Sequence, residues 1–547
     1  MVLVILDGFG VSLDAAGNPA AEAKKPILSE LERQFPLTTL QASGVAVGLP
    51  WGEAGNSEVG HLTMGAGRVI HHHLPRIIHS IRDGSFFENP ALRQAADHVR
   101  QHQSRLHIAG LVSSGSVHSY AEHLWALLEF AKRAEIPEVY LHIFTDGKDA
   151  PPKEGANFLA GVEERMRTEY PQARMASVIG RFFAMDRDEK WERVRRAYEL
   201  LTQGKGERIS SIPQYLEASY SRGITDDSIE QAMVLEVGGC LPAKALAQAG
   251  ELEVGGHGDK DKDKSPTIRE NDAVIFLNFR EDSMRELTRA FVEDDFDKFP
   301  RQIVSNLLMV TMTEYDKNIG GVRPAFPALE IVKPLGRVVS DAGLRQLRIA
   351  ETEKYAHVTY FFNGGDERPF SGEDRILIPS VMTLHVDETP QMRVHEITEK
   401  VIENVGEYDV IIANFANADM VGHSGNFQAA VEAVEALDGA LGVLSGAILK
   451  TGGVMLITAD HGNIELKRDR ISGEKLTEHS LNPVPFILVG NGFRRKTPRS
   501  DEEVIASKKE VGGILTDVAP TILELLGLEK PVEMTGQSLL SVLAIGV

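Results

Sequence analysis

Gly55-Asn56-Ser57-Glu58-Val59-Gly60-His61 is the stretch around which the chain is organised, and it places a serine between glycines. Glycines near a serine let the backbone turn sharply and leave the hydroxyl accessible to a partner. A serine hydroxyl is a weak nucleophile until a base or a metal ion activates it. Alone, the string is typical of an ordinary turn, so its meaning depends on the Asp and His residues elsewhere in the chain.

The composition indicates a globular protein with two or three domains. The chain has 547 residues, of which 42% are hydrophobic and 25% are charged. A net charge of -21 argues against nucleic-acid binding. It also repels anionic substrates at long range, so a phosphate ester would need a local group of Arg and Lys. The single cysteine, Cys240, excludes an intramolecular disulfide and a cysteine-based zinc site, and it fits a reducing compartment.

The apolar segments predict no membrane partner. No apolar run approaches the length of a membrane span. The segment from Met1 to Leu6 leads directly into Asp7, without the basic region and cleavage site of a signal peptide. We therefore expect a cytoplasmic protein, acting as a monomer on small molecules.

Several short apolar runs near the two ends of the chain predict strands of one parallel or mostly parallel sheet. They are Val2 to Leu6, Val410 to Ala413, Gly453 to Ala459 and Pro485 to Val489. Helices are predicted at Pro26 to Gln34 and at Asp517 to Leu526. In open α/β sheets ligands collect beyond the carboxyl ends of strands, so polar residues that follow these runs are candidates for a site.

The middle of the chain predicts a second α/β unit, because strands and helices alternate there. Its strands are expected at Leu106 to Val112, Val139 to Phe144, Ala176 to Ile179 and Ala273 to Asn278. Its helices include Tyr120 to Ala134 and Glu189 to Leu201. The alternating charges of 259–264 predict a solvated loop. His71, His72 and His73 are read as strand residues, whose side chains alternate between faces and cannot all reach one ion.

Carboxylates, imidazoles and Ser57 recur at the strand ends of the outer part of the chain. They are Asp7, Asp419, His423, Asp460, His461 and His479. This donor mixture suits Mn²⁺ or Zn²⁺ better than Mg²⁺ or Ca²⁺. The donors are too many for one ion and fit two ions sharing a site, as in phosphoryl transfer. A metal beside Ser57 would lower the pKa of its hydroxyl.

Basic residues follow the strands of the middle part. They are Lys148, Arg181, Arg187, Arg280 and Arg285. Because arginine matches phosphate and carboxylate oxygens with two nitrogens, the group predicts an anion pocket. His118 and Asp149 belong to the same layer of loops, and an aspartate among cations could act as a general base toward a substrate hydroxyl.

Nearly from end to end, the sequence resembles the cofactor-independent (2,3-bisphosphoglycerate-independent) phosphoglycerate mutases of the alkaline phosphatase superfamily. The motifs that carry the resemblance are Leu6–Gly10, Leu40–Gly44, Gly55–His61, Gly180-Arg181, Ala184–Asp188, Phe276–Arg280, Ala350–Val358, Asn414–Asn417, Asp419–His423, Thr458–Gly462 and Asn482–Pro485.

The resemblance implies an α/β protein of two domains. One is an alkaline-phosphatase-like three-layer α/β/α metal domain made of residues 1–72 and 329–547. The other is an inserted α/β transferase domain, residues 73–328, that binds the substrate.

The resemblance also implies two Mn²⁺ ions, with Zn²⁺, Co²⁺ or Mg²⁺ as alternatives. By motif position, Asp419, His423 and His479 would hold one ion. The other would be held by Asp7, Ser57, Asp460 and His461.

The implied reaction interconverts 3-phosphoglycerate and 2-phosphoglycerate in glycolysis and gluconeogenesis. Ser57 would carry the phosphoryl group, which Lys354 would steady. The positions matching those that hold glycerate or move its proton are His118, Asp149, Arg181, Arg187 and Arg280.

The sequence departs from the family pattern in the substrate half. Lys148 stands where the family usually has arginine, and it keeps the charge but lacks the planar fork. Ser283 likewise replaces an arginine, and Arg285 lies nearby in the chain. The alternatives to a mutase are a metal-dependent phosphohydrolase, in which water accepts the phosphoryl group from Ser57, and a binding protein that keeps only the fold. A water-excluding inserted domain favours the mutase, and the complete donor set argues against the binding protein.

Overall fold

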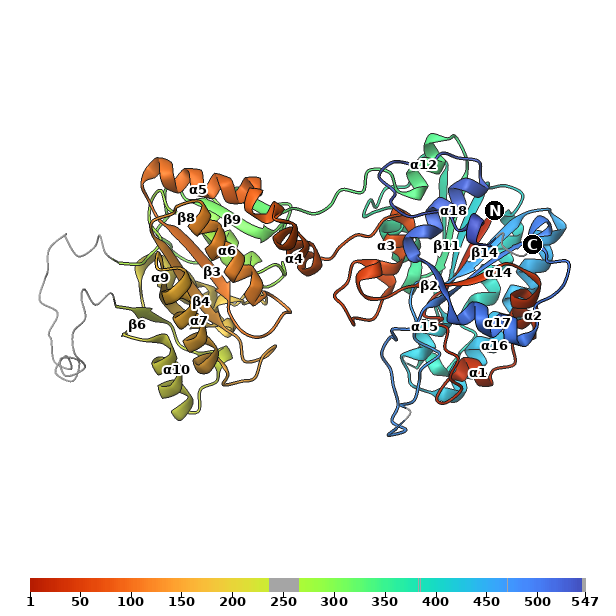
Figure 1. Ribbon diagram of the computed structural model, residues 1–547, viewed down its shortest axis with the longest axis horizontal. Coiled ribbons are helices and arrows are strands. Elements are labelled where there is room, and N and C mark those ends of the chain that lie inside the picture. Colours follow the sequence, from red (N-terminus) through yellow and green to blue (C-terminus); the bar gives the residue numbers. More distant parts are fainter. Residues whose placement is uncertain (236–264, 382, 384, 470, 544–547) are drawn as a thin grey trace, which may run out of the picture. The chain divides into compact units, whose positions relative to one another are not determined.

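The computed structural model describes residues 1–235, 265–381, 383, 385–469 and 471–543. It divides into two compact units. Unit 1 contains Met1–Pro75 and Leu329–Val547, and unit 2 contains Arg76–Ala328 (Figure 1). The charged segment 259–264 lies outside the described residues.

Unit 1 is built on a sheet of eight strands. In sheet order they are β12 (Glu373–Ile378), β11 (Gln346–Glu351), β13 (Val410–Phe415), β1 (Val2–Leu6), β14 (Val454–Thr458), β15 (Val484–Gly490), β2 (Leu37–Gln41) and β16 (Val511–Ile514). Every neighbouring pair is parallel except the two that include β15. The strands predicted for this unit are confirmed. The central strands are buried on both faces of the sheet, which explains why their residues are apolar.

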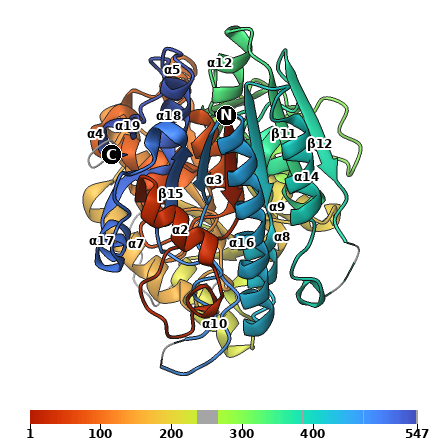
Figure 2. The same ribbon diagram turned by 90° about the vertical axis from the view of Figure 1, so that its right-hand side faces the viewer.

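Helices cover both faces of this sheet and give three layers. The long helix α16 (Phe427–Lys450) contacts α1 (Pro19–Glu22), α2 (Pro26–Gln34), α14 (Val394–Asn404) and α15 (Asn417–Gly422). Figure 2 shows α16, α14 and α2 together on one side of the sheet. A second group holds α3 (Ser57–Ala66), α12 (Leu335–Asp341) and α18 (Val518–Leu525). The remaining helices of unit 1 are α13 (Thr352–Ala356), α17 (Asp501–Lys509) and α19 (Leu540–Leu543).

Unit 2 has its own sheet of eight strands. In sheet order they are β10 (Val322–Phe326), β9 (Leu308–Thr313), β8 (Ala273–Phe276), β3 (Leu106–Leu111), β4 (Val139–Thr145), β5 (Ala173–Gly180), β7 (Ala232–Val234) and β6 (Glu207–Ile209). The strands from β10 to β5 are parallel, and β7 runs antiparallel to β5. This mostly parallel sheet confirms the prediction of a second α/β unit.

The helices of unit 2 separate its parallel strands. They are α5 (Pro90–His102), α6 (Ala121–Arg133), α7 (Gly155–Glu169), α8 (Arg181–Ala184), α9 (Trp191–Gln203), α10 (Ile212–Ser221) and α11 (Arg285–Val292). The prediction of strand structure at His71 to His73 is wrong, because α4 spans His73–Asp83 and the two preceding histidines belong to no strand. Among the described residues, no helix is long and apolar enough to cross a membrane.

Candidate active site

The predicted site residues of unit 1 converge at the carboxyl ends of neighbouring parallel strands. Asp7 follows β1, Asp419 lies in α15 after β13, Asp460 follows β14, and Lys354 lies in α13 after β11. Because β11, β13, β1 and β14 are adjacent in the sheet, residues far apart in the chain meet at one edge.

Ser57 is the first residue of α3. Asn56 caps this helix, since its side-chain oxygen accepts a hydrogen bond of 3.0 Å from the amide of Val59. The helix begins close to β14, and a Cβ added to Gly60 would lie 2.6 Å from the carbonyl oxygen of Asp460. A glycine is therefore required at position 60 for Ser57 to reach the strand ends.

The Ser57 hydroxyl lies within hydrogen-bonding distance of three other predicted site residues. Its Oγ is 2.7 Å from Lys354 Nζ, 3.0 Å from His461 Nε2 and 3.2 Å from Asp7 Oδ1. Ser57 is only 7% exposed, so these contacts are made with little competition from water. The hydroxyl is thus placed beside a cation, an imidazole and a carboxylate.

Two histidines and Asp419 form the outer side of the site. Asp419 Oδ1 lies 3.2 Å from His423 Nε2 and 3.1 Å from His479 Nε2, and the two imidazole nitrogens are 3.0 Å apart. The other ring nitrogen of each histidine is close to a main-chain carbonyl, at Thr477 and Gly55 respectively. Both Nε2 atoms are therefore directed at the same carboxylate.

The buried charges shift one another's pKa values. Burial raises the pKa of Asp7, with a further rise from Asp460. Burial acts in the same direction on Asp419, but the Lys354 ammonium and the neighbouring histidines together outweigh it and hold the pKa of Asp419 well below its usual range. The pKa of Lys354 is raised despite burial, because Asp7 and Asp419 stabilise the ammonium. Lys354 is therefore charged at neutral pH, 2.6 Å from both carboxylates.

The donor atoms fit divalent metal ions. Two groups have ligand atoms that all lie within 4.8 Å of one another, namely Asp419 with His461 and His479, and Asp7 with His61 and Asp460. Asp460 Oδ2 is buried and accepts no hydrogen bond from the described residues. A buried carboxylate oxygen that accepts no hydrogen bond and lies beside imidazoles is a suitable ligand for Mn²⁺ or Zn²⁺.

Sequence reasoning missed His61 as a member of the cluster. Its Nδ1 lies 2.8 Å from the carbonyl oxygen of Ser57 and 3.3 Å from Asp460 Oδ2, and it is fully buried. Asn414 Nδ2 lies 3.1 Å from His61 Nε2 and donates a hydrogen bond of 2.7 Å to Asp7 Oδ2. The spacing of four residues from Ser57 on a helix was the signal that could have found His61.

The predicted substrate residues lie in unit 2, at the carboxyl ends of adjacent strands. His118 follows β3, Asp149 follows β4, Arg181 follows β5 and Arg280 follows β8. Arg181 donates hydrogen bonds of 2.6 Å from one nitrogen to Asp149 and to Asp146, which sequence reasoning did not select. Burial, and then the nearby Arg181, lower the pKa of His118 to about 4, so this imidazole is neutral at pH 7.

The other basic residues of unit 2 are more open. Arg187 lies 2.7 Å from Asp282 Oδ2, and Arg280 lies 3.3 Å from the other oxygen of the same carboxylate. Arg285 donates to the carbonyl oxygen of Tyr315, and it lines a pocket of about 390 Å³ together with Arg187. Lys148 is exposed.

Ser283 contacts one of the predicted substrate residues. It is buried, and its Oγ lies 3.0 Å from Nδ1 of His118, so a hydroxyl contacts this imidazole.

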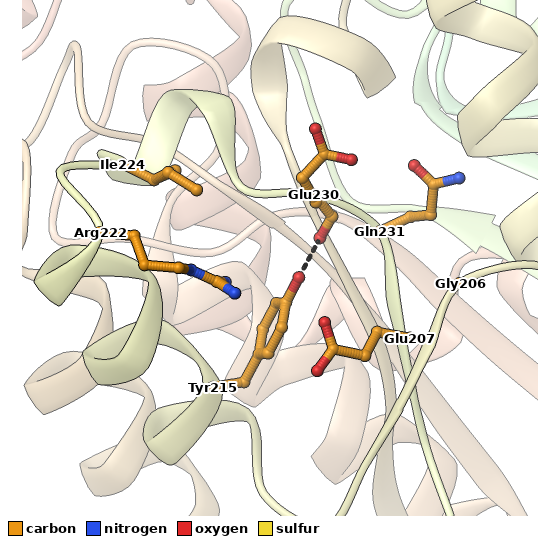
Figure 3. Close-up of a pocket in the computed structure, with 7 residues that line it drawn as sticks. All are labelled: Gly206, Glu207, Tyr215, Arg222, Ile224, Glu230 and Gln231. Atoms are coloured by element: carbon orange, nitrogen blue, oxygen red, sulfur yellow. Dashed lines mark hydrogen bonds between the residues drawn. The ribbon is translucent and has the colours of Figure 1, made fainter.

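A second pocket of unit 2 has a different character. It measures about 430 Å³ and is lined by Gly206, Glu207, Tyr215, Arg222, Ile224, Glu230 and Gln231 (Figure 3). The Tyr215 hydroxyl donates to the carbonyl oxygen of Glu230 at 3.3 Å. Two glutamates and one arginine line this pocket, and none of the predicted site residues does, so it does not form the predicted anion pocket.

The chain is similar to known proteins over almost its whole length. The family model described as the Metalloenzyme superfamily matches residues 1–530. The 2,3-bisphosphoglycerate-independent phosphoglycerate mutase of Moorella thermoacetica is 46% identical over 541 residues, which cover 99% of this chain and 98% of the relative. The protein of the same name from Synechococcus sp. (strain JA-2-3B'a(2-13)) is 46% identical over 542 residues, which cover 99% and 95%.

A solved structure of Leishmania mexicana phosphoglycerate mutase, at low cobalt concentration, matches with a TM-score of 0.55 and 29% identity. The match covers 98% of this chain and 96% of that chain. Because the family model matches residues 1–530 and curated relatives are 46% identical over 99% of the chain, the chain belongs to the 2,3-bisphosphoglycerate-independent phosphoglycerate mutases of the metalloenzyme superfamily.

Proposed function

We propose that the chain interconverts 3-phosphoglycerate and 2-phosphoglycerate through a phosphoryl group carried on Ser57 Oγ. The observation that carries this proposal is the convergence on Ser57 Oγ of Lys354 Nζ at 2.7 Å, His461 Nε2 at 3.0 Å and Asp7 Oδ1 at 3.2 Å. A buried hydroxyl in contact with a cation, an imidazole and a carboxylate is arranged for phosphoryl transfer.

Two Mn²⁺ ions are the proposed cofactors, with Zn²⁺, Co²⁺ or Mg²⁺ as alternatives. Asp419, His423 and His479 would hold one ion, and Asp7, Ser57, Asp460 and His461 would hold the other. Bound there, the ions would lower the pKa of the Ser57 hydroxyl and offset negative charge on the phosphoryl oxygens. His61 is placed to orient Asp460 from behind, since their nearest atoms are 3.3 Å apart.

Lys354 is proposed to steady the phosphoryl group. Its ammonium lies beside Ser57 Oγ and between two carboxylates, so it is held in place before the substrate arrives. Because the site is buried, a fixed positive charge there stabilises developing negative charge more strongly than it would in water.

The residues of unit 2 are proposed to bind the glycerate part of the substrate. They are His118, Lys148, Asp149, Arg181, Arg187, Arg280 and Arg285. Arg181 is held by Asp146 and Asp149, which fixes the direction of its guanidinium. Asp149 is proposed to accept and return a substrate proton.

The proposed transfer has two halves. Ser57 Oγ, which has lost its proton before the transfer, bonds to phosphorus as the bond from phosphorus to the 3-oxygen of the substrate breaks, and the released oxygen takes the proton that Asp149 carries. After the bound glycerate reorients, its 2-hydroxyl gives its proton to Asp149 and attacks the phosphorus. Ser57 Oγ then leaves, and 2-phosphoglycerate is formed without a second phosphorylated cofactor.

The setting of the enzyme is also a proposal. We expect a monomer in the cytoplasm, with no nucleic-acid or membrane partner. The net charge of -21 and the single cysteine support this setting. Light scattering on the eluting protein should report a mass near the chain mass of 60.0 kDa, and a dimer mass would contradict the monomer.

Trapping the phosphoryl group tests the mechanism. The protein is mixed with 3-phosphoglycerate and Mn²⁺, quenched in acid within milliseconds, digested and examined by mass spectrometry. Phosphate should be found on the peptide that contains Ser57, and Ser57→Ala should give neither phosphopeptide nor turnover. Full turnover by Ser57→Ala, or phosphate on another residue, would overturn the proposal.

A further inference from the structure

Lys467 is a fully buried lysine beside the active site for which the proposed mechanism has no role. Its relative exposure is 0%. Among the described residues, no carboxylate oxygen lies within ion-pair distance of its Nζ. Glu465 and Asp419 are near enough to favour its charged form, but neither forms an ion pair with it, so the buried ammonium depends on hydrogen bonds to other oxygens. Burial also lowers the pKa of Lys467 to about 8.

The ammonium donates to three oxygens that come from three different segments. They are the carbonyl oxygen of Gly422 at 3.3 Å, the carbonyl oxygen of Glu478 at 3.4 Å and Oδ1 of Asn463. Gly422 immediately precedes His423, and Glu478 immediately precedes His479. One ammonium therefore fixes the main chain next to both histidines.

The contact with Asn463 extends the same arrangement to Asp419. An ammonium can only donate, so the oxygen of the Asn463 amide must face Lys467 and the NH₂ must point away. That NH₂ donates to Asp419 Oδ1 at 2.8 Å and to the carbonyl oxygen of Asp419 at 3.2 Å. Lys467 thus sets the direction of an amide that holds the carboxylate.

Close packing leaves little freedom in this arrangement. A Cβ added to Gly422 would lie 2.7 Å from Asn463 Oδ1, so the amide is pressed against the end of α15. The main chain of Lys467 is held as well, since its amide donates to Gly17 and its carbonyl oxygen accepts from Leu476. The lysine is anchored at both ends.

We propose that Lys467 is a positioning residue for the metal-binding group Asp419, His423 and His479. The inference rests on the proposed function, because it concerns one of the two proposed metal sites. A positive charge near a cation disfavours metal binding electrostatically, so the contribution of Lys467 is geometric. Replacing a residue that orients metal ligands in this way typically weakens metal affinity by about 10- to 100-fold.

The test is a metal titration of the full-length, metal-free protein with Mn²⁺ by calorimetry. The variant is Lys467→Met, which has a similar length and no donor. Wild type should bind two equivalents, and Lys467→Met should weaken one step by about 10- to 100-fold while the other changes less than about threefold. His423→Ala, which removes a ligand of the same proposed site, should weaken the same step.

The matched control is Lys25→Met. Lys25 is a half-buried lysine of unit 1 that also donates to a main-chain carbonyl, that of Ala20, and it lies at the start of α2. This variant should bind both equivalents as the wild type does. Thermal unfolding of the metal-free proteins is measured in parallel. Lys467→Met removes a buried charge but also leaves three oxygens without their donor, and because these effects oppose each other the variant should unfold only slightly below the wild-type temperature.

The outcomes separate the inference from the proposed function. Unchanged binding by Lys467→Met, or equal weakening of both steps, would overturn the positioning role. A metal-free Lys467→Met protein that unfolds well below the wild type would assign the lysine to the fold and would also overturn it. If the wild type itself binds fewer than two equivalents, the two-metal proposal fails instead.

Discussion

Lys354 is the residue on which the charges of the active site depend. Lys354 is only 4% exposed, and its ammonium contacts Ser57, Asp7 and Asp419. Without it, the mutual repulsion of the buried carboxylates Asp7, Asp419 and Asp460 would increase. The lysine is thus important both for the free protein and for the proposed transfer.

Replacing Lys354 by glutamine should therefore lower kcat by at least about 100-fold, because a preorganised cation beside the transferring group is lost. Steady-state rates at saturating Mn²⁺ would measure this, with bound metal quantified in the same samples. Lys24→Gln, on an exposed lysine, serves as the control and should leave kcat unchanged. A Lys354→Gln protein that holds its metal and keeps kcat within about threefold would exclude the proposed role.

At the residue scale, the chemical type of the site residues was easier to predict than the contacts of their side chains. Asp7, Asp419, Asp460 and His461 follow apolar runs, so their meeting at one sheet edge could be foreseen. Asp146 and Lys467 could not be, because their importance comes from contacts with residues distant in the chain. The sequence predicted a lost arginine at Ser283, and only the structure places its hydroxyl 3.0 Å from His118.

At the scale of elements, the strands of unit 2 carry a buried polar chain that crosses the sheet. His107 on β3 lies 2.9 Å from His142 on β4, and His142 lies 2.8 Å from Ser177 Oγ on β5. His107 also lies 3.0 Å from Asp272, and Arg105 forms an ion pair with the same carboxylate. Burial lowers the pKa of His107 and holds the pKa of His142 well below 6.5. Both imidazoles are consequently neutral in the folded protein at pH 7.

These two buried histidines make the free energy of unfolding of unit 2 depend on pH. The unfolded histidines take up protons below about pH 6.5 and the folded ones do not, so the free energy of unfolding falls as the pH is lowered below that value. Each histidine contributes up to about 1.4 kcal/mol per pH unit. Denaturant unfolding of wild type and His142→Gln between pH 7.5 and 5.5 would measure this. The variant should lose less stability over that interval, and an identical loss in both proteins would refute the explanation.

The elements themselves were largely predictable from the sequence. Buried runs such as Val2–Leu6 and Val139–Thr145 form strands because apolar residues suit a parallel sheet covered on both faces. The segment at His71 to His73 was misread, since β-like alternation was assumed where a helix begins at His73. Short strands gave no comparable signal, because β6 contains two charged residues and β16 contains two glycines.

At the scale of the whole molecule, the chain forms two sheets with separate hydrophobic cores, and the proposed activity uses residues from both. The core of unit 1 joins residues from both ends of the chain, and a core cluster of unit 2 lies within residues 109–315. The proposed metal ligands all belong to unit 1, and the basic group belongs to unit 2. Metal binding should therefore stabilise one unit directly and leave the other unchanged.

Scanning calorimetry tests this division. Metal-free protein should unfold in two transitions, and Mn²⁺ at about 100 times its dissociation constant should stabilise one of them by about 3 kcal/mol per site. Asp460→Asn, which alters a proposed ligand, should reduce the shift. A single transition that moves as a whole with Mn²⁺ would show that the units do not unfold separately.

The most direct test of the central claim is an NMR time course of purified protein with Mn²⁺ and 3-phosphoglycerate, with no bisphosphoglycerate present. The account predicts that the phosphorus signal of 2-phosphoglycerate grows to equilibrium while no free phosphate appears, because Ser57 returns the phosphoryl group to bound glycerate. Free phosphate as the main product, or a requirement for added 2,3-bisphosphoglycerate, would contradict it.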